Sequence, residues 1–189
     1  ISVTNSGTAN MFLWVIRANT LTTKIFNAAS NNIGGTVANS ISLTSNGTTG
    51  SQVAGIQTSN AGSTWTSNIV RNLTNNNGTA TGTGASIVGL LSTTSSTNHT
   101  LSQNTIHAFH NSGTIVSVVI TGIHFIGGTA SVVERNNIYN LTTASSSNGA
   151  EINGIRVSGG TTTYRNNIIA LGANQATAIG AAASNAGTV

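Results

Sequence analysis

Few side chains in this 189-residue chain can do acid–base, nucleophilic or metal chemistry. The chain has two acids, Glu134 and Glu151, together with four histidines, no cysteine and no aspartate. A Ser-His-Asp triad needs an acidic third member, and a metal site needs two or three convergent ligands, usually with a carboxylate among them. We therefore predict no catalytic residue, no metal and no cofactor, and we expect Glu134 to pair with Arg135 or Arg165.

The four histidines are the remaining candidates for proton transfer or metal binding. His107 and His110 stand three residues apart in the segment HAFH, and Phe109 between them is predicted to point inward. No carboxylate lies nearby in the sequence. We interpret these two, and also His99 and His124, as surface residues.

Two sets of residues are candidates for binding a ligand on the surface. The first set directly follows the hydrophobic positions of one repeated motif: Arg71, His107, Tyr139 and Ile169. The second set follows another motif: Gln57, Leu91, His124 and Arg156. If the preceding aliphatic side chains point inward, both sets point outward, and an aromatic ring beside Arg and His can hold a sugar ring or an acidic polysaccharide. We predict a ligand-binding surface made of Arg71, His107, Tyr139, His124 and Arg156; the alternative is an ordinary exposed face.

The composition excludes several classes of partner. Only 4% of the residues are charged, against roughly 25% in an average soluble protein. The net charge of +4 comes from six basic residues spread singly along the chain, whereas nucleic-acid-binding proteins cluster theirs, so we predict no nucleic-acid partner. No stretch approaches the ~20 apolar residues of a membrane span, and MFLWVI at residues 11–16 is predicted to be a buried strand.

Internal repeats define the elements that carry these residues. The motif Asn-x-Ile/Val-x-x-Leu/Phe occurs as NIVRNL, NTIHAF, NNIYNL and NNIIAL, starting at Asn68, Asn104, Asn136 and Asn166. A degenerate earlier copy is expected in TKIFNA, at residues 23–28. The motif Ile/Val-x-Gly-Ile/Leu interleaves with it as VAGI, IVGL, ITGI and INGI, starting at Val53, Ile87, Ile120 and Ile152.

These units are short Ile/Val/Thr runs broken by Gly and Asn, which are signals for strands and turns and not for helices. We predict an all-β fold, a right-handed parallel β-helix (solenoid) of about five to six coils with about 30–36 residues per coil. Residues 1–189 would form a single solenoid domain, and we expect it to be a segment of a longer chain. The spacing of three inside each motif predicts a bend, eased by the glycine of one motif and by Asn72, Ala108, Asn140 or Ala170 in the other.

Stacked coils place equivalent residues in columns about 4.8 Å apart. One interior column is predicted to contain Val70, Ile106, Ile138 and Ile168. A structural ladder is predicted to contain Asn68, Asn104, Asn136 and Asn166, because a buried amide both donates and accepts along such a stack.

The segment NNIYNLT…INGIRVSGGTTTYRNNIIAL resembles the right-handed parallel β-helix repeats of pectin-lyase-like proteins. More narrowly, it resembles the repeats of long secreted surface proteins of Bacteroidetes-type bacteria. The resemblance covers roughly residues 23–171 and implies the fold and an extracellular or cell-surface location. Family members that cut polyuronides typically use clustered aspartates, which this sequence lacks.

The expected function is that of a non-catalytic extracellular structural or adhesive module, such as part of a stalk, sheath or fibre. Uncapped solenoid ends expose strand edges, so end-to-end self-association or continuation into neighbouring repeats is expected. The alternatives are a carbohydrate-binding module with a polysaccharide partner, and the remnant of a polysaccharide-cleaving enzyme.

Overall fold

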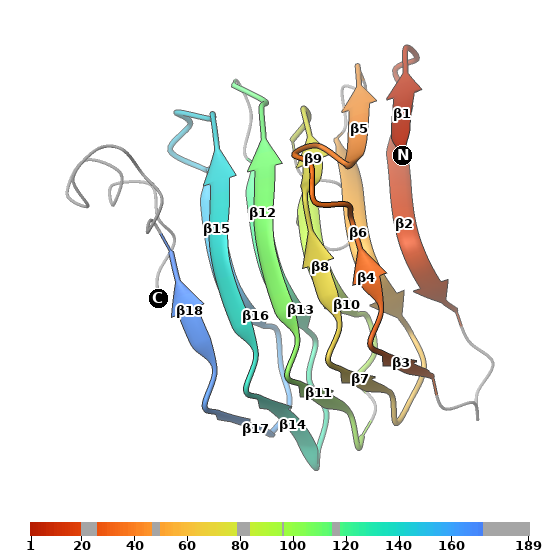
Figure 1. Ribbon diagram of the computed structural model, residues 1–189, viewed down its shortest axis with the longest axis vertical. Coiled ribbons are helices and arrows are strands. Elements are labelled where there is room, and N and C mark those ends of the chain that lie inside the picture. The colour runs from red at the N-terminus through yellow and green to blue at the C-terminus, as the bar shows by residue number, and fades with distance from the viewer. Residues whose placement is uncertain (20–25, 47–49, 79–83, 96, 115–117, 172–189) are drawn as a thin grey trace.

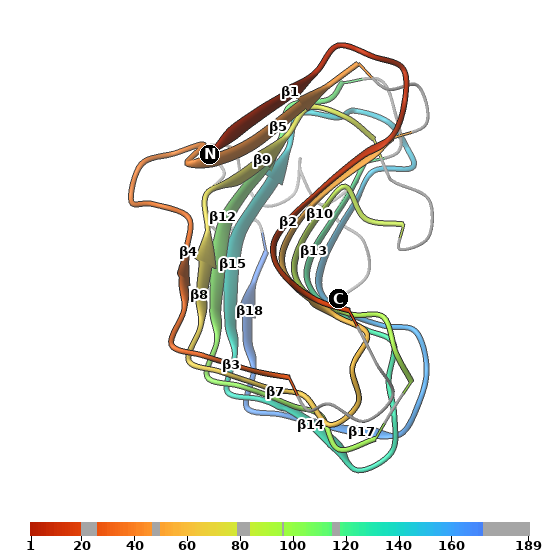
Figure 2. The same ribbon diagram turned by 90° about the vertical axis from the view of Figure 1, so that its right-hand side faces the viewer.

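The computed structural model describes residues 1–19, 26–46, 50–78, 84–95, 97–114 and 118–171. Within these ranges the chain is a parallel β-solenoid without helices, and it coils through three parallel sheets. Viewed from the N-terminal end, the chain runs clockwise as it recedes, so the coil is right-handed, as predicted (Figure 2). None of the described residues forms a helix long and apolar enough to cross a membrane.

Each coil passes through the three sheets in the order B, C, A (Figure 1). Sheet B contains β2 (Met11–Ala18), β6 (Ser51–Thr58), β10 (Ile87–Ser92), β13 (Val119–Phe125) and β16 (Glu151–Val157). Sheet C contains β3 (Asn27–Ala29), β7 (Thr64–Thr66), β11 (Thr100–Ser102), β14 (Ser131–Glu134) and β17 (Thr162–Arg165). Sheet A contains β1 (Ser2–Asn5), β4 (Asn32–Ile33), β5 (Ile41–Ser45), β8 (Ile69–Arg71), β9 (Leu73–Asn75), β12 (Thr105–Asn111), β15 (Asn137–Thr143) and β18 (Ile168–Ala170).

The described residues make about four turns, and the prediction of five to six was wrong. The asparagines that mark successive coils, from Asn31 to Asn167, are 37, 36, 32 and 31 residues apart. Dividing the whole chain by a period near 32 overestimates the number, because the first two coils are longer. The first of them holds extra residues in the loop 34–40, between β4 and β5. Residues 172–189 lie outside the described part of the chain.

The interior of sheet B follows the predicted Ile/Val-x-Gly-Ile/Leu motif. The first aliphatic positions form one column: Val53, Ile87, Ile120 and Ile152. The second positions form another: Ile56, Leu90, Ile123 and Ile155. Leu13 and Ile16 of β2 extend both columns, so MFLWVI is the first-coil copy of this motif.

The glycines of this motif allow close packing between sheets, and the interpretation that they supply an unusual backbone angle was wrong. A Cβ atom on Gly89 would lie 2.6 Å from Gly122 O and 2.8 Å from Ile106 Cγ2. Neither Gly89 nor Gly122, nor the equivalent Gly55 and Gly154, lies in the left-handed region. The glycine positions of sheet B therefore lie too close to the inner side chains of sheet A, and to the backbone of the next coil, to carry a side chain.

The interior column of sheet A contains Val70, Ile106 and Ile138, as predicted. Ile169 continues it at the C-terminal end, and the predicted Ile168 lies instead on the outer face beside Asn137. At the N-terminal end the column begins with Ile33. Residues 23–25 of the expected early copy lie outside the described part of the chain. Of its described residues, Ala28 pairs with Trp65 in sheet C and so does not belong to the sheet A column.

Left-handed residues occur at several positions in the coils, including one bend within sheet A and one corner between sheets C and A. Asn72, Ala108 and Asn140 have φ of 55°, 57° and 54°, as predicted, and the next residue in each case points into the core. Ala170, the predicted fourth member, lies opposite Tyr139 instead. The corner between sheets C and A was not predicted; its left-handed residues are Ser30, Ser67, Gln103, Arg135 and Asn166.

Candidate functional site

A ladder of asparagines runs along the solenoid where sheet C turns into sheet A. Its members are Asn31, Asn68, Asn104, Asn136 and Asn167. From Asn68 onward, each side-chain oxygen accepts hydrogen bonds from the asparagine one coil earlier; Asn104 Oδ1 accepts Asn68 N at 3.0 Å and Asn68 Nδ2 at 2.9 Å. Each Nδ2 from Asn68 onward also donates to a carbonyl of the preceding coil, as from Asn104 to Trp65 O at 2.9 Å. The buried amides of the column therefore satisfy one another.

The last member of this ladder is Asn167, and the predicted Asn166 was wrong. The segment RNNI occurs at Arg135 and again at Arg165, but the two copies differ in structure. Arg135 is the left-handed corner residue of its coil (φ 54°), whereas Arg165 is the last residue of a strand and Asn166 takes the corner (φ 54°). Arg165 Nε lies 2.6 Å from Glu134 Oε2, which confirms the predicted pairing of Glu134 with a nearby arginine and identifies it as Arg165. Asn tolerates the left-handed conformation better than Arg, which favours this register.

A second asparagine column, missed from the sequence, lies near the end of the sheet A strands. Asn75 and Asn111 pair in register and are fully buried. The oxygen of each accepts a backbone N–H two residues later, from Asn77 at 3.0 Å and from Gly113 at 2.8 Å. The signal was an Asn followed two residues on by Asn or Gly, which is typical of an Asx-turn.

Three of the predicted ligand-binding residues form one column on the outer face of sheet A. Arg71, His107 and Tyr139 lie opposite one another on successive coils, and all three are half-buried. The rings of His107 and Tyr139 stack at 4.7 Å with an interplanar angle of 6°. Partial burial, and then the neighbouring Arg71 charge, lower the pKa of His107 below its ordinary 6.5. The stack covers one face of each ring.

The other two predicted residues lie on sheet B, in a column that is mostly buried. Arg17, Gln57, Leu91, His124 and Arg156 are in register. Gln57, Leu91 and His124 are buried, so the expectation of an outward, solvent-exposed row was wrong. A small apolar cluster explains the burial, since Leu91 packs with Ala85, Val88, Val119 and the partly buried Trp14, away from the main core. At the N-terminal end Arg17 Cζ lies 4.0 Å from the centre of the Trp14 ring.

The two columns do not form one binding surface. Sheets A and B pack their inner faces together, so their outer faces point in opposite directions (Figure 2). His124 and Arg156 are therefore separated from Arg71, His107 and Tyr139 by the whole thickness of the solenoid. One small ligand therefore cannot contact both columns.

The acids and histidines remain dispersed. Glu134 lies in sheet C, and Glu151 lies at the start of β16 in sheet B, where its Oε2 is 3.4 Å from Asn153 Nδ2. His110 is exposed, with Nδ1 3.0 Å from Thr142 Oγ1, whereas His99 is buried and accepts Ser63 N–H at 3.2 Å. Two of the four predicted surface histidines, His99 and His124, are therefore buried. Among the described residues, no group of three or more His, Cys, Asp or Glu could hold a metal ion.

His124 predicts a pH-dependent stability. Burial, and then the Arg156 charge, lower its pKa from 6.5 to about 4, while Nε2 lies 2.8 Å from Ser158 Oγ. Between these values the unfolded chain binds a proton that the folded chain does not. Stability is therefore complete above pH 6.5 and falls as the pH drops toward 4, by up to about 3 kcal/mol from this residue.

Denaturant unfolding measured from pH 4 to 7.5 tests this expectation. We expect His124→Gln to flatten the dependence of the unfolding free energy on pH. His110→Gln, on the exposed face of sheet A, is the matched control and should keep the wild-type slope. An unchanged slope in His124→Gln would refute the assignment.

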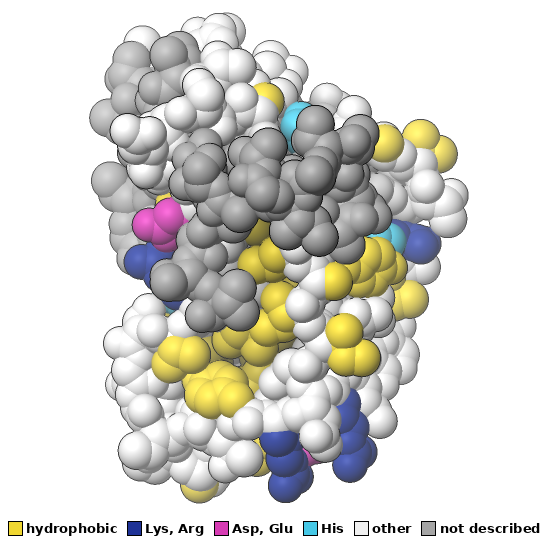
Figure 3. Space-filling model, turned by 90° about the vertical axis from the view of Figure 1, so that its left-hand side faces the viewer, with side chains coloured by type: hydrophobic (Ala, Val, Ile, Leu, Met, Phe, Trp, Pro, Cys, Tyr) yellow, Lys and Arg dark blue, Asp and Glu magenta, His cyan; other side chains and the backbone are white. Residues whose placement is uncertain are grey.

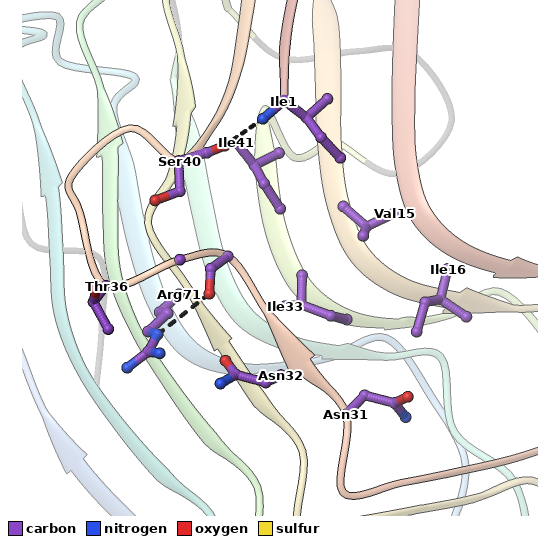
Figure 4. Close-up of a pocket in the computed structure, with 12 residues that line it drawn as sticks. Ile1, Val15, Ile16, Asn31, Asn32, Ile33, Thr36, Ser40, Ile41 and Arg71 are labelled. Carbon is purple, nitrogen blue, oxygen red and sulfur yellow. Dashed lines mark hydrogen bonds between the residues drawn. The ribbon is translucent and has the colours of Figure 1, made fainter.

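A hollow of about 690 Å³ opens at the N-terminal end of the solenoid. Its lining combines interior aliphatic side chains, such as Val15, Ile16 and Ile33, with Asn31 of the ladder (Figure 4). Arg71 lies at its rim and donates from Nε to Gly34 O at 3.4 Å. The hollow thus lies against the first described coil, and its lining mixes aliphatic side chains with polar residues and glycines of the loop 34–40.

These features define a parallel β-solenoid repeat protein whose coils are joined by an internal asparagine ladder. No protein-family model, no curated protein and no solved structure matches the chain.

Proposed function

We propose that this chain is a non-catalytic structural module that acts outside the cell, as a stiff segment of a stalk, sheath or fibre. The observation that carries the proposal is the unbroken register of three parallel sheets over the described coils. Each coil contacts only its neighbours, so stability adds coil by coil along the axis. Such stacking resists bending because every coil is joined to the next by three ladders and by the asparagine column.

The chemistry of the side chains supports a structural role. The two acids lie on different sheets, and one of them is engaged by Arg165. The asparagine ladder, a continuous series of buried side-chain hydrogen bonds, lies in the interior and joins successive coils. The resemblance to secreted surface repeats and the low charge of the chain support a location outside the cell.

A second candidate is a carbohydrate-binding module that uses the sheet A column. The half-buried row of Arg71, His107 and Tyr139 favours it, because it places a guanidinium, an imidazole and a phenol in line along a flat sheet. Their polar edges can donate hydrogen bonds to sugar hydroxyls or carboxylates. The ring faces that a sugar would stack on are partly taken by the His107–Tyr139 contact.

One experiment separates these functions. The purified chain is incubated with neutral and acidic polysaccharides, and both retention on the polymer and release of new reducing ends are measured. We expect neither for a structural module. Retention that Tyr139→Ala abolishes and Thr142→Ala keeps would favour the carbohydrate-binding module, and new reducing ends would overturn the non-catalytic proposal.

A separate measurement tests the extracellular location: antibodies against the chain should label intact cells of its source.

A further inference from the structure

Three asparagine–glycine pairs within the described ranges lie in different structural settings. Asn148–Gly149 lies in the loop 144–150, which follows the tip of β15 (Figure 1). Asn77–Gly78 lies just after β9, and Asn153–Gly154 lies within β16. Because glycine has no Cβ atom to shield its backbone nitrogen, an asparagine before glycine is especially prone to lose its side-chain amide. The surroundings of each pair determine whether that reaction can occur.

The pair Asn148–Gly149 is open to attack. Both residues are exposed, and the side-chain amide of Asn148 has no hydrogen-bond partner among the described residues. The N–H of Gly149 points toward Ser147 Oγ, which accepts it at 3.3 Å, and not toward the side chain of Asn148. The Asn148 side chain can therefore rotate until its Cγ faces the Gly149 nitrogen, and water and hydroxide reach both atoms.

Hydrogen bonds hold the side chain of Asn77 in place. Its Nδ2 donates to Ser45 O at 3.2 Å, and its Oδ1 accepts the N–H of Gly78 at 2.7 Å. The Gly78 nitrogen thus presents a proton, and not an electron pair, to this side chain. Gly78 is also buried, and its carbonyl accepts Ser51 N–H at 3.4 Å. Reaction at Asn77 requires these bonds to open first, which makes it slower.

Strand pairing protects Asn153. It lies opposite Thr121 in the register between β16 and β13, and its Nδ2 donates to Glu151 Oε2 at 3.4 Å. Gly154 is buried, with the side chain of Ile169 close against it. Attack by the Gly154 nitrogen on Asn153 would require the peptide plane between them to rotate, and β16 would have to separate from β13 for that to happen.

We propose that Asn148 is a site of spontaneous deamidation, with water as the only co-reactant. The Gly149 nitrogen gives its proton to hydroxide and attacks Asn148 Cγ. The new N–Cγ bond closes a cyclic imide, the Cγ–Nδ2 bond breaks, and Nδ2 leaves as ammonia with a proton from water. A second water then opens the ring, adding its hydroxyl to a carbonyl carbon and its hydrogen to the nitrogen. Opening at Cγ gives aspartate, and opening at the backbone carbonyl gives isoaspartate.

The product brings a new carboxylate to a chain that is almost uncharged. The chain contains no aspartate, and the modification lowers its formal net charge of +4 by one unit. Charged side chains cover only small parts of the face that Figure 3 shows. The new carboxylate stands three residues before Glu151, in the loop that joins sheet A to sheet B. The modification therefore makes this loop locally acidic, whether or not the structural function above is correct.

Incubation of the folded chain in heavy-oxygen water at mildly alkaline pH tests this proposal, because each carboxylate that forms takes an oxygen atom from the solvent. Cleavage after arginine and glutamate places Asn77, Asn148 and Asn153 in different peptides, and tandem mass spectrometry gives the converted fraction at each. We expect Asn148 to convert at least about tenfold faster than the other two. In the chain unfolded by urea, the three rates should be similar. Equal rates in the folded chain would overturn the proposal.

The variant Gly149→Ala tests the role of the attacking nitrogen. Gly149 does not lie in the left-handed region, so alanine can adopt its backbone conformation, and the added methyl group shields the nitrogen. We expect Asn148 to convert several-fold more slowly in this variant, with the rate at Asn153 unchanged. Ser146→Ala, at an exposed position of the same loop, is the matched control and should convert like the wild type. An unchanged rate in Gly149→Ala, or a product without isoaspartate, would refute the cyclic imide.

Discussion

Replacing Asn136 with leucine is expected to lower the free energy of unfolding by about 3–5 kcal/mol. The side chain is fully buried, and its Oδ1 accepts Asn104 N at 3.0 Å and Asn104 Nδ2 at 2.9 Å. Its Nδ2 donates to Leu101 O at 3.0 Å. Leucine has a similar volume but removes the partners of Asn104 N–H and Leu101 O and one of the two hydrogen bonds of Asn104 Nδ2, which keeps its bond to Trp65 O. Each buried group that loses its partner costs about 1–3 kcal/mol. The added apolar contact offsets only part of this cost.

Asn137→Leu is the matched control for this prediction. The two residues are adjacent asparagines, but Asn137 lies on the outer face of sheet A and is partly exposed. Its replacement should change stability by less than about 0.5 kcal/mol. Denaturant unfolding followed by circular dichroism measures both variants. Equal effects at the two positions would show that the ladder does not stabilise the solenoid.

Replacing Gly89 with alanine is expected to destabilise the chain by about 3 kcal/mol or more, and to lower the yield of folded protein. The new Cβ atom would lie 2.6 Å from Gly122 O, which belongs to the backbone of the next coil. That oxygen cannot move unless β10 and β13 separate, because the two strands pair along their length. Overpacking of this kind in a rigid core costs several kcal/mol.

Two further variants identify the cause of this loss. Gly7→Ala is the control, since its Cβ atom would meet only the side-chain oxygen of Asn5, at 3.3 Å, and should be nearly neutral. The double variant Gly89→Ala/Ile106→Ala removes the second close contact, with Ile106 Cγ2, but leaves the one with the Gly122 oxygen. We expect no rescue. Recovery in the double variant would mean that side-chain crowding, and not the backbone contact, sets the cost.

The motif spacing was sufficient to predict the fold and most of the interior. Aliphatic residues that recur once per coil must stack if the chain is a parallel solenoid, so Val70, Ile106 and Ile138 share a column whatever the loops do. The same reasoning predicted the ladder at Asn68, Asn104 and Asn136, because a buried amide can be satisfied by its own neighbours. These inferences depend only on period and residue type, which the sequence states directly.

Register in the last coil was decided by tertiary structure. The repeated RNNI predicts Asn166 in the ladder, because identical segments are expected to occupy equivalent positions in successive coils. The ion pair between Glu134 and Arg165 and the left-handed corner at Asn166 move the ladder to Asn167. Two consecutive asparagines satisfy the motif equally well, so the choice depends on contacts with the previous coil.

Burial of the outer faces was likewise not predictable from alternation along a strand. Alternation correctly assigned His107 and His124 to outer faces, but only sheet A leaves its residue half-exposed. On sheet B, His124 is 4% exposed beside a separate cluster that includes Ala85 and Leu91. The sequence alone determined the class of fold, its interior columns and most of its asparagine ladder, because these follow from local periodicity. The tertiary structure decided the register of the last coil, the packing role of the glycines and the exposure of each column, because these depend on contacts between segments distant in the chain.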